Sequence, residues 1–184
     1  MKIKKQFGYI ALLTSVTLTA QAGNFNYSYG ELGYETGDFD GLTLTGSFEI
    51  NKDMFILARY VGVSEEVFGI DFDYTEVSVG AGYHMPIDQK TDAVLTASFV
   101  NGEVDTVGGI TVDDNGVLLT AGVRHNLNPQ VELAGNLYYI SIFDGDFGIR
   151  GEARYNINPT MSAGLSFTSG DYLDGVGINF RLGF

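Results

Sequence analysis

The feature that most constrains this chain is a two-residue alternation of apolar and polar side chains, which recurs in long segments. Successive side chains of a strand point to opposite faces of a sheet, so a period of two predicts strands. Most of these segments have about nine to twelve residues, the length that a tilted strand needs to cross the hydrocarbon layer of a membrane. The expected strands are 24–34, 41–50, 54–61, 74–85, 92–100, 116–126, 130–140, 147–157, 160–168 and 175–184.

The alternation of the first segment changes phase near Gly30, which predicts a β-bulge at that glycine. We expect the last strand to pair with the first strand near residues 25–29, so that the sheet has no free edge.

The first 22 residues differ from the rest of the chain. Three lysines precede a mostly apolar run, and the run ends in the small-x-small sequence Ala20-Gln21-Ala22. This pattern predicts a secretory signal peptide that is cleaved after Ala22. A membrane anchor is the alternative, but the run is too short to span a bilayer as a helix. Residues 23–184 are then expected to form one domain, and the absence of cysteine excludes disulfide bonds within it.

The connections between the expected strands alternate in length. Four of them are short (51–53, 86–91, 127–129 and 158–159), and they contain all the prolines of the chain. The others are longer and acidic (35–40, 62–73, 101–115, 141–146 and 169–174), hold most of the 23 acidic residues and contain no Lys or Arg. The pattern is typical of an up-and-down antiparallel transmembrane β-barrel of about ten strands, with eight as the alternative.

The two faces of the strands distinguish a membrane barrel from a soluble sandwich. In segment 147–157, apolar residues alternate with Arg150, Glu152 and Arg154, and a membrane barrel directs such charges into its lumen. Aromatic residues lie near strand ends, where membrane interfaces are: Phe48, Tyr60, Tyr83, Tyr139, Tyr155 and Phe184. The charged residues expected in the lumen are Glu49, Arg59, Glu76, Arg124, Glu132, Arg150, Glu152, Arg154 and Arg181.

Two functions follow from this set of lumen charges. Unpaired charges in a narrow lumen are costly, so we expect ion pairs that tie the strands together and plug the barrel. The protein then has a non-catalytic structural or surface-interaction role, with acidic loops outside the cell. The alternative is a narrow, porin-like channel for small solutes or ions, in which the same charges form a constriction.

Catalysis and cofactor binding are not expected. The two histidines, His84 and His125, both lie beside short turns, so the longer loops lack a general base. We expect His84 in the lumen near the rim and His125 at the interface. The formal net charge of −13 argues against nucleic acid as a partner.

Pairs of aspartates separated by one residue are weak candidates for binding a hard cation such as Ca²⁺. A solvated acidic rim is the alternative interpretation, and no confident metal site is expected. If cations bind, they are expected to bridge the rim to the phosphates of lipopolysaccharide. The pairs are Asp38 with Asp40, Asp71 with Asp73, and Asp144 with Asp146.

The apparent signal peptide, the units "VGAGYHMPI" and "AGVRHNLNPQVEL", and the final strand ending on Phe184 resemble one group of proteins. This group is the small bacterial outer-membrane β-barrels related to OmpX, the OmpA transmembrane domain and the opacity proteins. The resemblance implies a protein in the outer membrane of a Gram-negative bacterium, in contact with lipid and lipopolysaccharide, with its short turns in the periplasm. It also implies insertion by the barrel-assembly machinery, which reads a C-terminal signal at Ile178, Phe180, Leu182 and Phe184. We expect the protein to be a monomer.

Deletion of Phe184 is expected to reduce delivery to the outer membrane far more than the stability of a barrel that has already folded. The measurements are the amount of protein in outer-membrane fractions and the urea midpoint of the refolded barrel. Equal losses in both would contradict an insertion signal.

Overall fold

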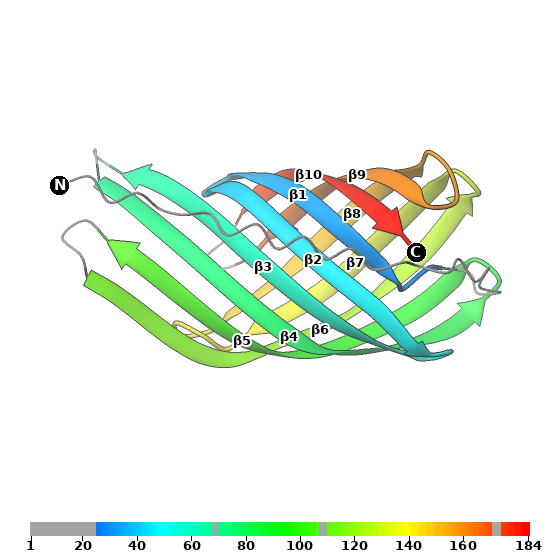
Figure 1. Cartoon of the computed structure of the whole chain (residues 1–184), viewed down its shortest axis with the longest axis horizontal. Coiled ribbons are helices and arrows are strands. Elements are labelled where there is room, and N and C mark those ends of the chain that lie inside the picture. The colour runs from blue at the N-terminus through cyan, green and yellow to red at the C-terminus, as the bar shows by residue number, and fades with distance from the viewer. Residues whose placement is uncertain (1–24, 68–69, 107–109, 171–173) are drawn as a thin grey trace.

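Ten antiparallel strands form a closed barrel that holds most of the described chain (Figure 1). The computed structural model describes residues 25–67, 70–106, 110–170 and 174–184. Each strand pairs with its neighbours in sequence, and the first strand pairs with the last, which confirms the expected all-β, ten-stranded, up-and-down barrel. The described residues include no helix long and apolar enough to cross a membrane. The strands are β1 (Tyr29–Gly37), β2 (Asp40–Asn51), β3 (Met54–Val67), β4 (Ile70–Asp88), β5 (Thr91–Thr106), β6 (Ile110–Asn128), β7 (Val131–Ile140), β8 (Asp146–Asn156), β9 (Met161–Ser169) and β10 (Gly175–Gly183).

The apolar residues of the strands face outward. In β10, Ile178 is 61% exposed, whereas the neighbouring Asn179 is 8% exposed and faces the lumen. A soluble protein would not leave such a surface in water, but a membrane barrel directs it to lipid. The outward set includes every aromatic residue that was expected at an interface: Phe48, Tyr60, Tyr83, Tyr139, Tyr155 and Phe184.

One end of the barrel, the short-turn rim, carries the connections β2–β3, β4–β5, β6–β7 and β8–β9. Asparagine side chains shape three of these turns. Asn51, Asn128 and Asn158 each accept hydrogen bonds through Oδ1 from the backbone N–H groups two and three residues later. Such side-chain bonds replace the pairing that the backbone loses where the chain reverses. The start of β1 and the end of β10 also lie at this rim, since Tyr29 is opposite Gly183.

The long acidic loops expected at the opposite rim are, for the most part, strands. β4 and β6 each have 19 residues and β5 has 16, so these strands continue through most of 62–73 and 101–115. In Figure 1 the β3–β4 and β5–β6 hairpins project furthest at the left. Beyond a membrane both faces of a hairpin meet water, so the strand loses the apolar alternation by which it is recognised.

The expected bulge at Gly30 is wrong. β1 pairs with β10 and β2 through Gly30 without a shift of register, and the strand begins only at Tyr29. Residues 25–28 are not part of the barrel wall, although the Ser28 carbonyl accepts a hydrogen bond from the Phe184 N–H at 3.0 Å. The change of phase in the sequence marks the place where the chain leaves the lumen and enters the sheet.

A charge placed at Leu165 tests whether the outward surface of the barrel lies in hydrocarbon. Leu165 lies in the middle of β9 and is 63% exposed. Leu165→Arg is expected to lower the free energy of unfolding by about 2–4 kcal/mol, because it places a charge in hydrocarbon. Leu127→Arg, beside the β6–β7 turn, is the matched control and is expected to cost about 0–1 kcal/mol, because it lies near the interface. The measurement is urea unfolding in lipid vesicles. Equal costs at the two depths would contradict a membrane-spanning surface.

Candidate functional site in the barrel lumen

The segment 25–28 folds into the lumen at the short-turn rim, and we call it the N-terminal plug. The Tyr27 hydroxyl donates to Asp92 Oδ2 at 3.0 Å, and the Tyr27 carbonyl accepts from Ser47 Oγ at 2.6 Å. The Asn26 carbonyl accepts from Arg124 Nη1 at 3.3 Å. Because these partners belong to β5, β2 and β6, the plug is bonded to three separate parts of the wall.

Aromatic packing fills the space around the plug. The Tyr27 ring, in a residue only 2% exposed, stacks on Phe55 at 4.9 Å and on His84 at 3.9 Å between ring centroids. The Arg124 guanidinium carbon lies 4.6 Å from the Phe25 ring centroid and 4.7 Å from that of Tyr27. Stacked rings and a cation over their faces are favourable where water is excluded. The plug therefore packs its aromatic side chains densely against the lumen wall at this rim.

His84 has the position expected from sequence, whereas the expected place of His125 at the membrane interface stays a prediction. His84 is buried in the lumen at the short-turn rim, where its Nδ1 lies 3.3 Å from Asp92 Oδ2. His125 is half-buried on β6 beside the β4–β5 turn, and its Nδ1 lies 2.9 Å from Thr91 Oγ1.

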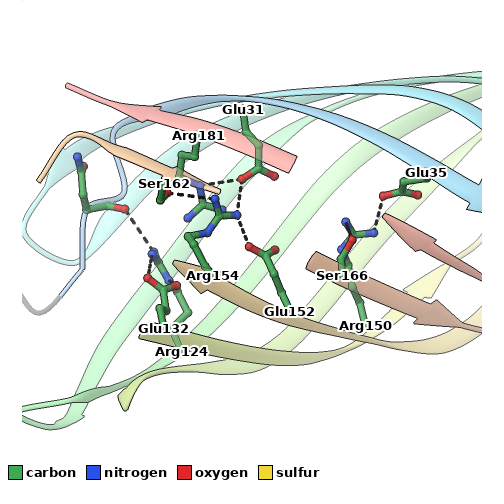
Figure 2. A network of polar contacts seen from close by, with 11 residues as sticks. Glu31, Glu35, Arg124, Glu132, Arg150, Glu152, Arg154, Ser162, Ser166 and Arg181 are labelled. Atoms are coloured by element: carbon green, nitrogen blue, oxygen red, sulfur yellow. Dashed lines mark hydrogen bonds and ion pairs between the residues drawn. The ribbon is translucent and has the colours of Figure 1, made fainter. Parts of the chain in front are cut away.

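Ion pairs form three successive clusters along the lumen, which follow one another from left to right in Figure 2. Next to the plug, Arg124 bonds both carboxylate oxygens of Glu132, at 2.8 and 3.1 Å. In the middle cluster, Glu31 accepts from Arg154 at 2.6 Å and from Arg181 at 2.8 Å. Arg154 also pairs with Glu152.

The third cluster and one separate pair complete the set. Arg150 donates to Glu35 at 2.7 Å and to the hydroxyls of Thr168 and Ser166. On the wall formed by β3 and β4, Arg59 lies 3.3 Å from Glu76, which also accepts a hydrogen bond from Tyr74. Each arginine of the chain thus has a carboxylate partner in the described lumen.

Two members of the network were not expected in it. Glu35 had been assigned to an outer loop, and Glu31 belonged to a segment whose phase was misread. In the sequence both glutamates alternate with Leu32 and Tyr34, which lie on the outer surface, and this alternation would have predicted them in the lumen. Of the residues that were expected in the lumen, Glu49 differs from the others. Its backbone N–H donates to Ser28 Oγ, but one carboxylate oxygen is buried without a hydrogen-bond partner among the described residues.

The lumen is not polar all round, although the sequence analysis identified only charged residues in it. The ion pairs along β1, β8 and β10 form one wall. Across from them, β3, β5 and β6 direct valine and leucine side chains inward. Between the two walls lies a cavity of about 650 Å³. The inward aliphatic residues that line it include Leu57, Val61, Val63, Val94 and Leu118.

The β7–β8 connection partly covers the other end of the cavity. Ile142 is 4% exposed and occupies the space that the absent side chain of Gly102 leaves. Phe143 and Asp144 have φ values of 51° and 75°, in the left-handed region that is unusual outside glycine. The Phe143 N–H donates to Asp114 Oδ2 at 2.8 Å, which holds the turn over the lumen.

The structure places the two aspartates of one candidate cation-binding pair, Asp144 and Asp146, in different environments. Asp144 is exposed, whereas Asp146 faces the lumen and accepts a hydrogen bond from Tyr138. Asp38 accepts from the Asp174 backbone N–H, and Asp73 lies across from Asp105. Asp40 is exposed at the start of β2, and the Asp71 side chain lies outside the described part of the structure. No cluster of three or more potential metal ligands occurs among the described residues.

Arg154, whose side chain is 2% exposed, tests the energetic role of the network. Arg154→Met is expected to lower the free energy of unfolding by roughly 3–5 kcal/mol, because it leaves buried carboxylates without their cation. Arg59→Met is the matched control, and it should cost less because the Arg59 side chain is 29% exposed. Urea unfolding in vesicles measures both. If both variants lower the free energy of unfolding by a similar, small amount, the buried ion pairs do not hold the strands together.

The sequence matches no family model and no curated protein. Solved structures do share the fold. The KdgM porin aligns with a TM-score of 0.51 at 10% identity over 85% of this chain and 99% of its own, and the NanC porin gives 0.51 and 10% over 85% and 98%. Neisserial surface protein A aligns less closely, with a TM-score of 0.47 at 14% identity over 85% of this chain and 94% of its own. The resemblance to small outer-membrane β-barrels is confirmed at the level of fold.

Proposed function

We propose that this protein is a non-catalytic outer-membrane barrel whose lumen is closed to ions at the short-turn rim. The observation that carries the proposal is the N-terminal plug, in which Tyr27 is almost completely buried. The resemblance drawn from sequence places this rim in the periplasm. The acidic hairpins then project from the cell, where they suit a surface-interaction role.

Opening the lumen at the short-turn rim would break several interactions together. The plug would lose its hydrogen bonds to Asp92, Ser47 and Arg124, and the stacked rings of Tyr27 and Phe55 would separate. Asp92, which is 1% exposed, would lose its hydroxyl donor. A buried carboxylate without a donor is costly, so the bonded arrangement favours the closed state.

A narrow channel is the second candidate, and the cavity of about 650 Å³ favours it. KdgM and NanC are porins by name, and one KdgM structure is described as a complex with oligogalacturonate, an acidic sugar chain. Here each arginine of the lumen has a carboxylate partner, so no cation is left to receive an acidic sugar. A channel in this barrel would therefore suit neutral solutes better than acidic ones.

Conductance in a planar bilayer separates the two candidates. The native protein is expected to give no unitary current steps. Phe25→Gly with Tyr27→Gly should produce steps, because it removes the rings that close the lumen at the short-turn rim. The matched control is Phe48→Gly with Tyr155→Gly, which removes the same ring types from the outer surface.

Stable current steps from the native protein that are as large as those of the double variant would contradict the proposal. Arg150→Ser with Arg154→Ser distinguishes closure by the plug from closure by the ion pairs. If that variant conducts while the plug is intact, the ion-pair network is the barrier.

A further inference from the structure

We infer that the cavity above the plug is a binding site for a small, uncharged and largely apolar molecule. This inference goes beyond the proposed function and does not depend on whether the barrel conducts.

The dimensions of the cavity fit a ligand of this class. Its volume of about 650 Å³ lies within the range of about 300–1,000 Å³ typical of small-molecule sites. A barrel that serves only as a plug can fill its lumen with side chains. This lumen instead keeps an open space bounded by aliphatic side chains such as Val61, Val63 and Leu118. Water against such a wall is unfavourable, and an apolar ligand would displace it.

The paired charges on the wall of β1, β8 and β10 disfavour a strongly charged ligand. On the opposite wall Arg150 is paired with Glu35, and Arg181 with Glu31. An anion would have to take an arginine from its carboxylate, and a cation would have to take a carboxylate from its arginine. Either exchange leaves a buried charge without a partner, which costs more than the new contact supplies.

A few polar groups lie within the apolar wall. The hydroxyls of Thr96 and Thr120 are 2.7 Å apart, and both threonines line the cavity. A hydroxyl or carbonyl group on a ligand would find a donor or an acceptor there. Tyr27 forms part of the floor and Phe143 part of the roof, so an aromatic ring lines the space at each end. The site therefore suits a compact ring compound with one or two polar atoms.

The test uses the neutral fluorescent dye N-phenyl-1-naphthylamine with the full-length barrel in lipid nanodiscs. Empty nanodiscs of the same composition give the background from partition into lipid. Leu118→Trp is the lumen variant, because the indole fills the cavity, and Leu119→Trp is the matched control, because Leu119 is exposed on the outer surface. Folding of each variant is checked by the shift in gel mobility on heating.

The native barrel and Leu119→Trp are expected to bind one dye in a saturable manner above the background. Leu118→Trp should weaken that binding by at least about tenfold, because overpacking removes the space for the ligand. Val94→Phe, which adds volume on β5, should weaken it in the same direction if Leu118→Trp fails to fold. The inference is overturned if the native barrel shows no saturable component, or if Leu119→Trp alone abolishes it, which would place the dye on the outer surface.

Discussion

Hydrocarbon cannot hydrogen-bond a peptide group, and this constraint determines the rest of the structure. A sheet in that medium has to close, and here closure is the pairing of β1 with β10 from Tyr29 to Gly37. Closure gives the strands one face toward lipid and one toward an enclosed lumen. The apolar outer surface and the paired charges inside are both consequences of that division.

Charged groups in a narrow, enclosed lumen need partners, and the two walls of this lumen meet that requirement in different ways. On the side of β1, β8 and β10, arginine and glutamate neutralise each other in bonded clusters. On the side of β3, β5 and β6, aliphatic side chains need no polar partner, and the arginines of these strands, Arg59 and Arg124, are paired with Glu76 and Glu132. The plug adds a third element, because residues 25–28, which precede β1, contribute aromatic rings that neither wall supplies. The cavity is the volume that these elements leave unfilled.

Most of the fold was predictable from sequence, because lipid imposes a period of two on every residue that it touches. Strand count, strand direction and the outward aromatic residues all follow from that period. The projecting hairpins were misjudged as loops, since water on both faces imposes no such pattern. The plug was misread as strand for a related reason: Phe25 and Tyr27 alternate with polar residues, as strand residues do, yet their partners are lumen side chains far away in sequence. The pairing of Glu31 with Arg154 and Arg181 depends on register around the closed barrel, which no local pattern encodes.

The central claim is that the lumen is sealed at the short-turn rim by the N-terminal plug, and the absence of cysteine makes a direct measurement possible. Thr120→Cys places a thiol on the cavity wall, and Lys90→Cys places one on the β4–β5 turn as a reference for access. A membrane-impermeant thiol reagent is supplied to oriented vesicles only from the short-turn side. The account predicts rapid labelling at position 90 and none at position 120, with labelling at position 120 appearing once Tyr27→Gly is added. Rapid labelling at position 120 with the plug intact would contradict it.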